Sequence, residues 1–245
     1  MERQLQDLPE NIRKILTDFG NAAIEACGKN LESIVLFGSA AEGRLRPSSD
    51  VNLILVLKDF EVSQINQLRE MLRVAHAAIR LNVMFILDSE ISAASEAFAV
   101  KFTDIQHRHR ILIGTNPFEK LEVSRAATIQ RLNQVIINLI LRLRERYSLV
   151  SLREEQLVHI IADVAGPIRS SAATILGLEG KEEFHPKEAL QTYVQKLPGN
   201  NWHEILKNMS RTREDQELKS GEATSTLLGL LDLLKIMHKH VQDLK

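Results

Sequence analysis

The spacing of apolar residues changes character once along this chain of 245 residues. In the first part, short β-branched and aromatic runs alternate with segments of helical period. The runs cover residues 33–37, 51–57, 81–87 and 109–113, and the helical segments cover residues 8–30 and 61–79. Beyond these, the helical period continues to the end of the chain. The pattern predicts a fold of the α/β (α+β) class, with a mixed sheet and flanking helices, followed by an all-α helical bundle.

The change of period falls at a turn-forming sequence, Gly114-Thr115-Asn116-Pro117. We therefore expect a first domain over residues 1–117 and a helical-bundle domain over residues 118–245. Bundle helices are predicted over residues 118–147, 152–176, 186–196 and 222–244, with a kink or break at Gly166-Pro167. The more polar stretch 198–221 is predicted to be the loosest part of the bundle.

Charge and composition exclude several classes of protein. The 31 basic and 32 acidic side chains give a net charge of −1, so there is no strong signal for nucleic-acid binding. A single cysteine, Cys27, excludes an internal disulfide framework. The amino terminus has no apolar secretory segment, and the longest apolar stretch, residues 135–143, is too short to span a bilayer. We expect a cytoplasmic protein that does not enter a membrane.

The loop between the first two predicted strands carries the strongest functional signal. Gly38-Ser39 follows the first strand, ten residues intervene, and Asp50-Val51-Asn52 opens the second strand. A glycine at a strand end allows a sharp turn, after which backbone amides and the Ser39 hydroxyl can face a phosphate. Because side chains alternate along a strand, Asp50 and Asn52 are expected on one face of the sheet.

This spacing resembles the signature of the polymerase-β-like (minimal) nucleotidyltransferase superfamily. The wider sequence, with Gly43, Arg44, Arg46 and Pro47-Ser48, also resembles small bacterial nucleotidyltransferases. The resemblance implies a nucleotidyltransferase-like first domain in which Gly38, Ser39 and Arg44 contact a nucleotide or phosphate. It also implies that three acids hold two Mg²⁺ ions, of which Asp50 would be one metal ligand.

The sequence departs from this signature at the other two acids. Asn52 stands at the position of the second acid, and Asn82 is the only polar candidate for the third on the strand 81–87. Losing one negative charge about 4 Å from a cation costs on the order of 4 kcal/mol at an effective dielectric constant of 20. We therefore predict a catalytically impaired protein, a pseudoenzyme, with Mg²⁺ and nucleoside triphosphate binding weak or absent. The alternative is an active Mg-dependent nucleotidyltransferase that uses Asp50 and Glu42 and transfers a nucleoside monophosphate to a small molecule, protein or RNA end.

The remaining features leave alternatives open. The helical domain is expected to bind a protein partner or form a homodimer, and the impaired domain is expected to serve as a phosphate-binding or regulatory scaffold. The basic sequence 107–110 either contacts phosphate or RNA or protects an edge strand from pairing, with the second favoured. Arg153 and His159 loosely resemble the Arg-to-His motif of HEPN ribonuclease domains, although two helical positions six apart do not share a face.

Overall fold

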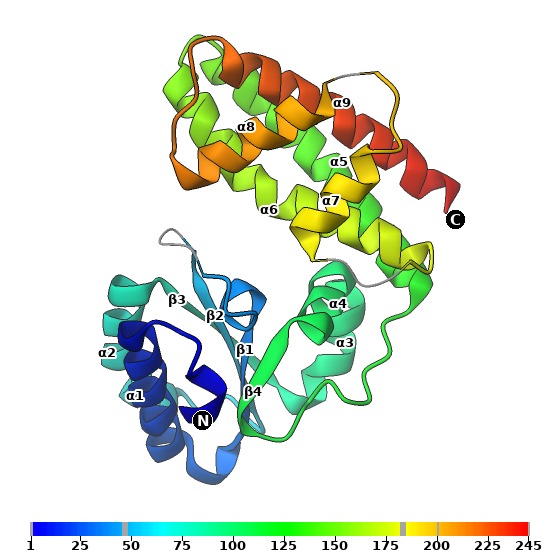
Figure 1. Ribbon diagram of the computed structural model, residues 1–245. Coiled ribbons are helices and arrows are strands. Elements are labelled where there is room, and N and C mark those ends of the chain that lie inside the picture. The colour runs from blue at the N-terminus through cyan, green and yellow to red at the C-terminus, as the bar shows by residue number, and fades with distance from the viewer. Residues whose placement is uncertain (1, 46–48, 182–184, 200, 245) are drawn as a thin grey trace. The chain divides into compact units, whose positions relative to one another are not determined.

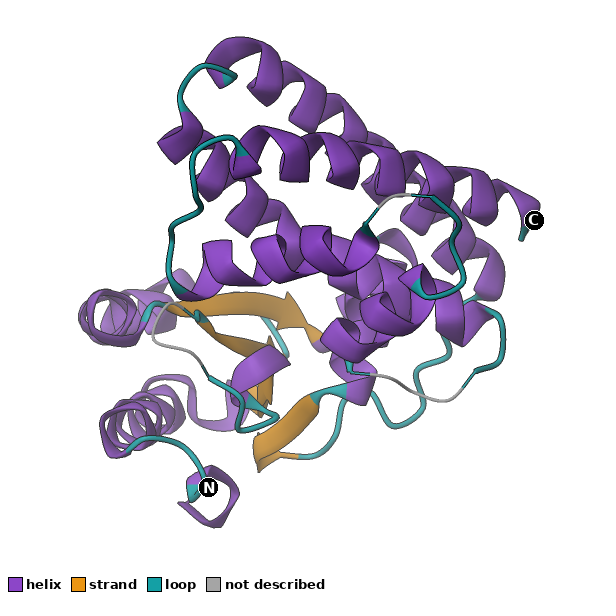
Figure 2. Cartoon of the chain, turned by 45° about the horizontal axis from the view of Figure 1, so that its top comes forward, coloured by secondary structure: helices purple, strands orange, loops and turns teal. Residues whose placement is uncertain are grey.

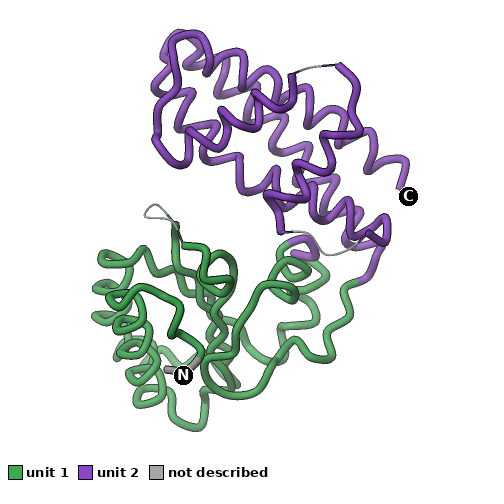
Figure 3. Tube along the Cα trace, viewed as in Figure 1, with its two compact units in different colours: residues 1–97, 101–123 green, residues 98–100, 124–245 purple. Residues whose placement is uncertain are grey.

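The computed structural model describes residues 2–45, 49–181, 185–199 and 201–244. The chain divides into two compact units, coloured separately in Figure 3. Unit 1 contains residues 1–97 and 101–123, and unit 2 contains residues 98–100 and 124–245. The boundary predicted after Pro117 lies in the segment that joins the last strand of unit 1 to the first long helix of unit 2.

Unit 1 is built on a four-stranded mixed sheet with the strand order β3-β2-β1-β4. The strands are β1 (Leu31–Phe37), β2 (Val51–Leu57), β3 (Leu81–Leu87) and β4 (His109–Gly114). β1 pairs antiparallel with both β2 and β4, whereas β2 and β3 are parallel. The four strands and the mixed sheet predicted from the apolar runs are thus confirmed.

Helices cover both faces of this sheet (Figures 1 and 2). α1 (Glu10–Cys27) and α2 (Val62–Ile79) pack on the face that receives Leu53 and Leu55 of β2. The other face receives Ile54 and Val56, and it packs against α3 (Ile91–Ala97) and the carboxyl-terminal part of α4 (Ala99–His107). The alternation along β2 follows from the period of two of an extended strand that is buried on both faces.

Unit 2 is a bundle of helices around one apolar core. The helices in its described part are α5 (Arg125–Val150), α6 (Glu154–Leu178), α7 (Pro186–Val194), α8 (Trp202–Glu214) and α9 (Glu222–Asp243). The bundle predicted from the helical period is therefore confirmed. No helix in the described ranges is both long enough and apolar enough to cross a membrane.

Three details of unit 2 differ from the predicted helices. The long helix predicted from residue 118 begins at Arg125, because Ser124 caps its amino terminus and accepts from the Ala127 amide. α6 continues through Pro167 without a break. The polar stretch 198–221 contains α8, which contributes Trp202 and Met209 to the core. Its few apolar residues recur at helical spacing, at positions 202, 205, 206 and 209, but they lie within a mostly polar stretch.

Candidate functional site at one end of the sheet

The residues singled out between the first two strands meet at one end of the sheet. The strand register places Asn52 of β2 opposite Asn82 of β3, and also opposite Phe37 of β1. Phe37 is in turn opposite His109 of β4. The four side chains therefore form one row across the sheet, with neighbouring strands about 4.8 Å apart. Asn52 shares the parity of Ile54, so the row lies on the face that packs against α3 and α4.

The Gly38-Ser39 turn follows this row directly. Gly38 has φ of +76°, in the left-handed region that favours glycine, and its amide donates to the carbonyl of Arg108 at 3.0 Å. Residues Gly38–Ala40 then form one turn of 3-10 helix, η3, which the Ala41 amide closes by donating to the Gly38 carbonyl at 3.0 Å. The Arg44 amide donates to the Ser39 carbonyl at 2.9 Å. A Cβ atom placed on Gly38 would lie 3.9 Å from Nδ2 of Asn52, so the Asn52 amide lies beside the turn.

The other predicted ligands lie around the turn with less constraint. Asp50 is exposed and comes directly before β2. Arg44 is exposed and Ser39 is half-buried. Arg46, with Pro47 and Ser48, lies outside the described residues. The turn and the row therefore bring Gly38, Ser39, Asn52 and Asn82 to one end of the sheet. Asp50 is assigned to the same end because it directly precedes β2.

A lysine that the sequence analysis did not single out lies over this face of the sheet. The Nζ atom of Lys101, on α4, is 3.9 Å from Sδ of Met84 and 5.7 Å from the centroid of the Phe37 ring. Met84 lies two residues beyond Asn82 on β3, and Phe37 is the register partner of Asn52. Burial of the ammonium group against these side chains lowers the pKa of Lys101. A cationic group therefore lies on the same face of the sheet as the two asparagines.

No family model and no curated protein matches the sequence. Among solved structures, the chain is similar to the spectinomycin adenyltransferase AAD(9) from Enterococcus faecialis, crystallised with ATP and spectinomycin. The TM-score is 0.63 at 14% identity, over 91% of this chain and 98% of that chain. This chain has a nucleotidyltransferase fold.

The nucleotidyltransferase fold predicted from the loop and strand spacing is thus confirmed, together with its helical extension. A second acid that could compensate for the asparagines was sought on the loop. Glu42 does not face solvent as a free loop charge, because its carboxylate is 3.2 Å from Nη1 of Arg108. Arg108 also donates from Nε to Asp104 at 2.8 Å. Burial opposes the charged form of Arg108, but its pairing with Asp104 and Glu42 outweighs this and raises the pKa of the guanidinium.

We tested whether the residues at this end of the sheet fit the two divalent ions of the nucleotidyltransferase fold. Such ions require several carboxylates that converge. At this end of the sheet, Asn52 and Asn82 are neutral, and Lys101 adds positive charge to the same face. Within the described residues, no group of three or more His, Cys, Asp or Glu side chains converges as a metal site would require. The described residues do not fit a two-ion centre.

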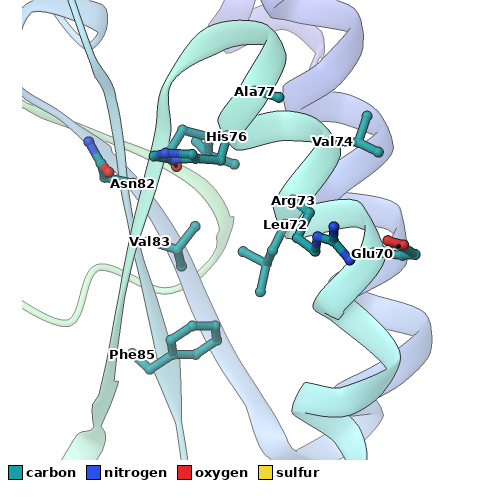
Figure 4. A pocket seen from close by; sticks show the side chains of 10 residues that line it. Glu70, Leu72, Arg73, Val74, His76, Ala77, Asn82, Val83 and Phe85 are labelled. Atoms are coloured by element: carbon teal, nitrogen blue, oxygen red, sulfur yellow. Dashed lines mark hydrogen bonds and ion pairs between the residues drawn. The ribbon is translucent and has the colours of Figure 1, made fainter.

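A shallow groove of about 840 Å³ runs along the outer edge of β3, beside α2 (Figure 4). Val83 and Phe85 point into it from β3, and His76 and Leu72 line it from α2. Asn82 borders the groove but points to the opposite side of the strand from Val83 and Phe85 (Figure 4). The groove and the row of asparagines are therefore on different faces of the sheet.

Basic side chains of the sequence 107–110 form hydrogen bonds and ion pairs within unit 1. β4 is an edge strand, as the favoured interpretation requires. Arg110 donates to Oδ1 and Oδ2 of Asp7 at 2.6 and 2.7 Å and to the Gln4 carbonyl at 2.7 Å, which attaches the amino-terminal segment to the sheet. Nδ1 of His109 lies 2.9 Å from the Ile105 carbonyl and therefore carries a proton. With Arg108, which pairs with Asp104 and Glu42, at least three of the four basic side chains thus bind neighbouring parts of the same unit.

The two residues of the ribonuclease-like pattern are both exposed in unit 2. Arg153 precedes α6, and His159 lies in the second turn of that helix. Because Arg153 lies outside the helix, the helical spacing that argued against a shared face does not apply to this pair.

Proposed function

We propose that unit 1 binds the phosphate groups of a nucleoside triphosphate or a related ligand without a two-ion centre, with nucleotidyl transfer impaired. The protein then acts as a phosphate-responsive scaffold. The observation that carries this proposal is the pairing of Asn52 with Asn82 in register across β2 and β3. Both positions where the resemblance implies an acid are neutral, and they are neighbours.

The electrostatics of the face support this assignment. A nucleotidyltransferase needs negative charge from several acids here to hold cations. In this chain Asp50 is the one acid that the resemblance places at the site, whereas Asn52 and Asn82 are neutral and Lys101 adds an ammonium group. A phosphate is itself an anion, so a site with these groups attracts it directly rather than through a divalent ion. The lysine therefore supplies, on a smaller scale, the positive charge that metal ions supply in an active enzyme.

The turn beside the asparagines provides the geometry for such a ligand. The amides of Gly38, Ala41, Glu42, Gly43 and Arg44 donate to backbone carbonyls. The phosphate contacts that we propose therefore come from the amides of Ser39 and Ala40, at the start of η3, and from the Ser39 hydroxyl. ATP is the first ligand to test, because the structurally similar adenyltransferase was crystallised with ATP.

The scaffold function implies that unit 2 carries the partner interaction, either with another protein or with a second copy of the chain. We also expect the alternative, an active transferase with Asp50 and Glu42 as ligands, to fail. Recruiting Glu42 to a metal would remove it from Arg108, a partly buried guanidinium with a side chain 18% exposed.

Equilibrium binding of ATP to Lys101→Met tests the proposal. We expect affinity to fall roughly tenfold, the size of one charge-assisted contact of 1.4 kcal/mol. The matched control is Lys29→Met, which removes an exposed lysine just before β1, at the opposite end of that strand from the Gly38 turn. Equal affinities for the two variants would contradict the proposal. So would transfer of label from α-labelled Mg-ATP to any acceptor in a cell extract that is lost in Asp50→Ala.

A further inference from the structure

A cavity in unit 2 has the composition of a binding site. It has a volume of about 800 Å³ and lies among α6, α7 and α8. Both α7 and α8 pack on α6 (Figure 1). A volume of this size is typical of sites for small organic ligands. All of its lining residues belong to unit 2 and to the described ranges.

The charged side chains of this cavity are mostly basic. Arg169 comes from α6, Lys187 from α7, and Lys207 and Arg211 from α8, whereas Glu214 is the one acidic residue among those that line it in the described structure. Arg211 is paired with Glu222 at 3.3 Å, so the basic character of the cavity rests on Lys187 and Lys207 beside Arg169. A concave surface lined by one sign of charge focuses its field on a ligand of the opposite sign.

Arg169 is a buried cation at the cavity. It is only 5% exposed, and a buried guanidinium is uncommon unless it is hydrogen-bonded or has a function. One of its Nη atoms donates to Oγ of Ser210 at 2.9 Å, which fixes the guanidinium against α8. Ser210 in turn donates to the Leu206 carbonyl. The basic group is thus held in position by a hydrogen-bonded chain.

The uncharged lining is part polar, with Gln191, Gln195 and Ser210, and part apolar. The apolar part contains the single tryptophan of the chain. Trp202 is 7% exposed, and its Nε1–H is buried without a hydrogen-bond acceptor among the described residues. Buried donors of this kind are normally satisfied by a protein group, a water or a ligand. Leu190, Val194 and Met209 complete the apolar wall.

We propose that this cavity binds a small organic anion, in which a phosphate or carboxylate group is joined to an aromatic or apolar body. The anionic group contacts Lys187, Lys207 and the region of Arg169, and the apolar body packs against Trp202. The site is separate from the phosphate site proposed for unit 1, and the two are independent: either can fail without the other.

Fluorescence of Trp202 reports on the cavity directly, because no other tryptophan contributes. Phenyl phosphate is the probe, with inorganic phosphate as the anion without a ring and benzyl alcohol as the ring without a charge. We expect a saturable change with phenyl phosphate and binding roughly tenfold weaker for each of the other two, since each lacks one of the two contacts. Benzoate in place of phenyl phosphate then separates a carboxylate ligand from a phosphate ligand.

A pair of double variants tests the role of the basic residues. Lys187→Gln with Lys207→Gln removes two charges from the cavity, and we expect phenyl phosphate to bind at least about tenfold more weakly. Lys235→Gln with Lys239→Gln removes the same charge from exposed positions of α9 and should leave binding unchanged. Lys101→Met should also leave it unchanged, which distinguishes this site from that of unit 1.

Three outcomes would overturn the proposal. They are the absence of a saturable Trp202 response at millimolar phenyl phosphate, an equal loss in the two double variants, and tighter binding of hexaglutamate than of phenyl phosphate with the same dependence on Lys187 and Lys207. The last outcome would assign the basic cavity to an acidic peptide instead.

Discussion

Asn52 and Asn82 are direct partners in the parallel pairing of β2 and β3. Two carboxylates at these neighbouring positions would repel each other unless a cation lay between them. Two amides carry no such penalty, so this end of the sheet keeps its structure without a divalent ion. Lys101 lies over the same face, near Met84 and Phe37. Its ammonium group would repel a divalent cation bound there.

Restoring the two acids should therefore restore a requirement for cations. In Asn52→Asp/Asn82→Asp, we expect the free energy of unfolding to fall by about 1–3 kcal/mol in EDTA, since two carboxylates face each other. Millimolar Mg²⁺ should recover part of this loss. Urea unfolding with and without Mg²⁺ measures both effects. Stability that is the same as wild type in EDTA, or an equal Mg²⁺ response of the wild type, would contradict the prediction.

The lowered pKa of Lys101 gives phosphate binding a dependence on pH. Lys101 binds an anion only when it is protonated, and burial of the ammonium group lowers its pKa below the ordinary lysine value of about 10.4. ATP affinity should thus fall as pH rises through the lowered pKa, before an ordinary lysine would lose its proton. Titration of ATP across alkaline pH measures this, and Lys101→Met should remove the pH-dependent component. A profile that is unchanged in Lys101→Met would show that another group titrates.

Arg108 should contribute strongly to the stability of unit 1. Its guanidinium pairs with both Asp104 and Glu42, and its side chain is 18% exposed. Arg108→Ala leaves two carboxylates without their partner, and we expect a loss of about 2–4 kcal/mol. Chemical denaturation measures the loss. In Glu42→Gln the remaining pair with Asp104 is kept, so a loss as large as that of Arg108→Ala would contradict this account.

The Gly38 turn should tolerate no side chain without strain. Its φ of +76° costs an L-residue about 1–2 kcal/mol, although a Cβ would meet Asn52 only at an ordinary 3.9 Å. Gly38→Ala should therefore lower the free energy of unfolding by that amount and also weaken ATP binding. Gly166→Ala, in α6 where a Cβ meets nothing within 4 Å, is the control and should be neutral or slightly stabilising. Equal stabilities of the two variants would count against strain at the turn.

The ion pair between Asp7 and Arg110 should make the free energy of unfolding depend on pH in the acid range. The hydrogen bond from Arg110 lowers the pKa of Asp7, so its folded value lies below its unfolded value. Its contribution to stability is therefore present above the unfolded pKa of about 3.9 and is lost as pH falls through the lowered folded pKa. Comparing wild type with Asp7→Asn in acid unfolding should show the difference in stability narrowing in that window. A difference that is constant across the window would contradict the ion pair.

The four strands and the helices α1 and α2 followed from local patterns, because β-branched runs and helical periods are properties of neighbouring residues. The spacing of Gly38-Ser39 from Asp50 and Asn52 likewise indicated the nucleotidyltransferase fold. The amphipathic period was sufficient for α5, α6, α7 and α9. The same period is present in α8, which was nevertheless missed because its few apolar residues lie within a mostly polar stretch.

The parts that could not be predicted are contacts between distant residues. Arg108 meets Glu42 across 66 positions, and Lys101 reaches the site from a helix that the apolar period did not indicate. Neither contact can be recognised in a local sequence pattern, because both depend on how α4 packs on the sheet. The basic cavity of unit 2 has the same origin, since Arg169, Lys187 and Lys207 come from three helices.

Calorimetric titration of ATP in EDTA and again with excess Mg²⁺ tests the central claim, that phosphate binding by this fold needs no divalent ion. We predict that ATP binds in EDTA at least as tightly as in Mg²⁺, and that Lys101→Met weakens the binding in both. Binding that is absent in EDTA and appears only with Mg²⁺ would contradict the claim.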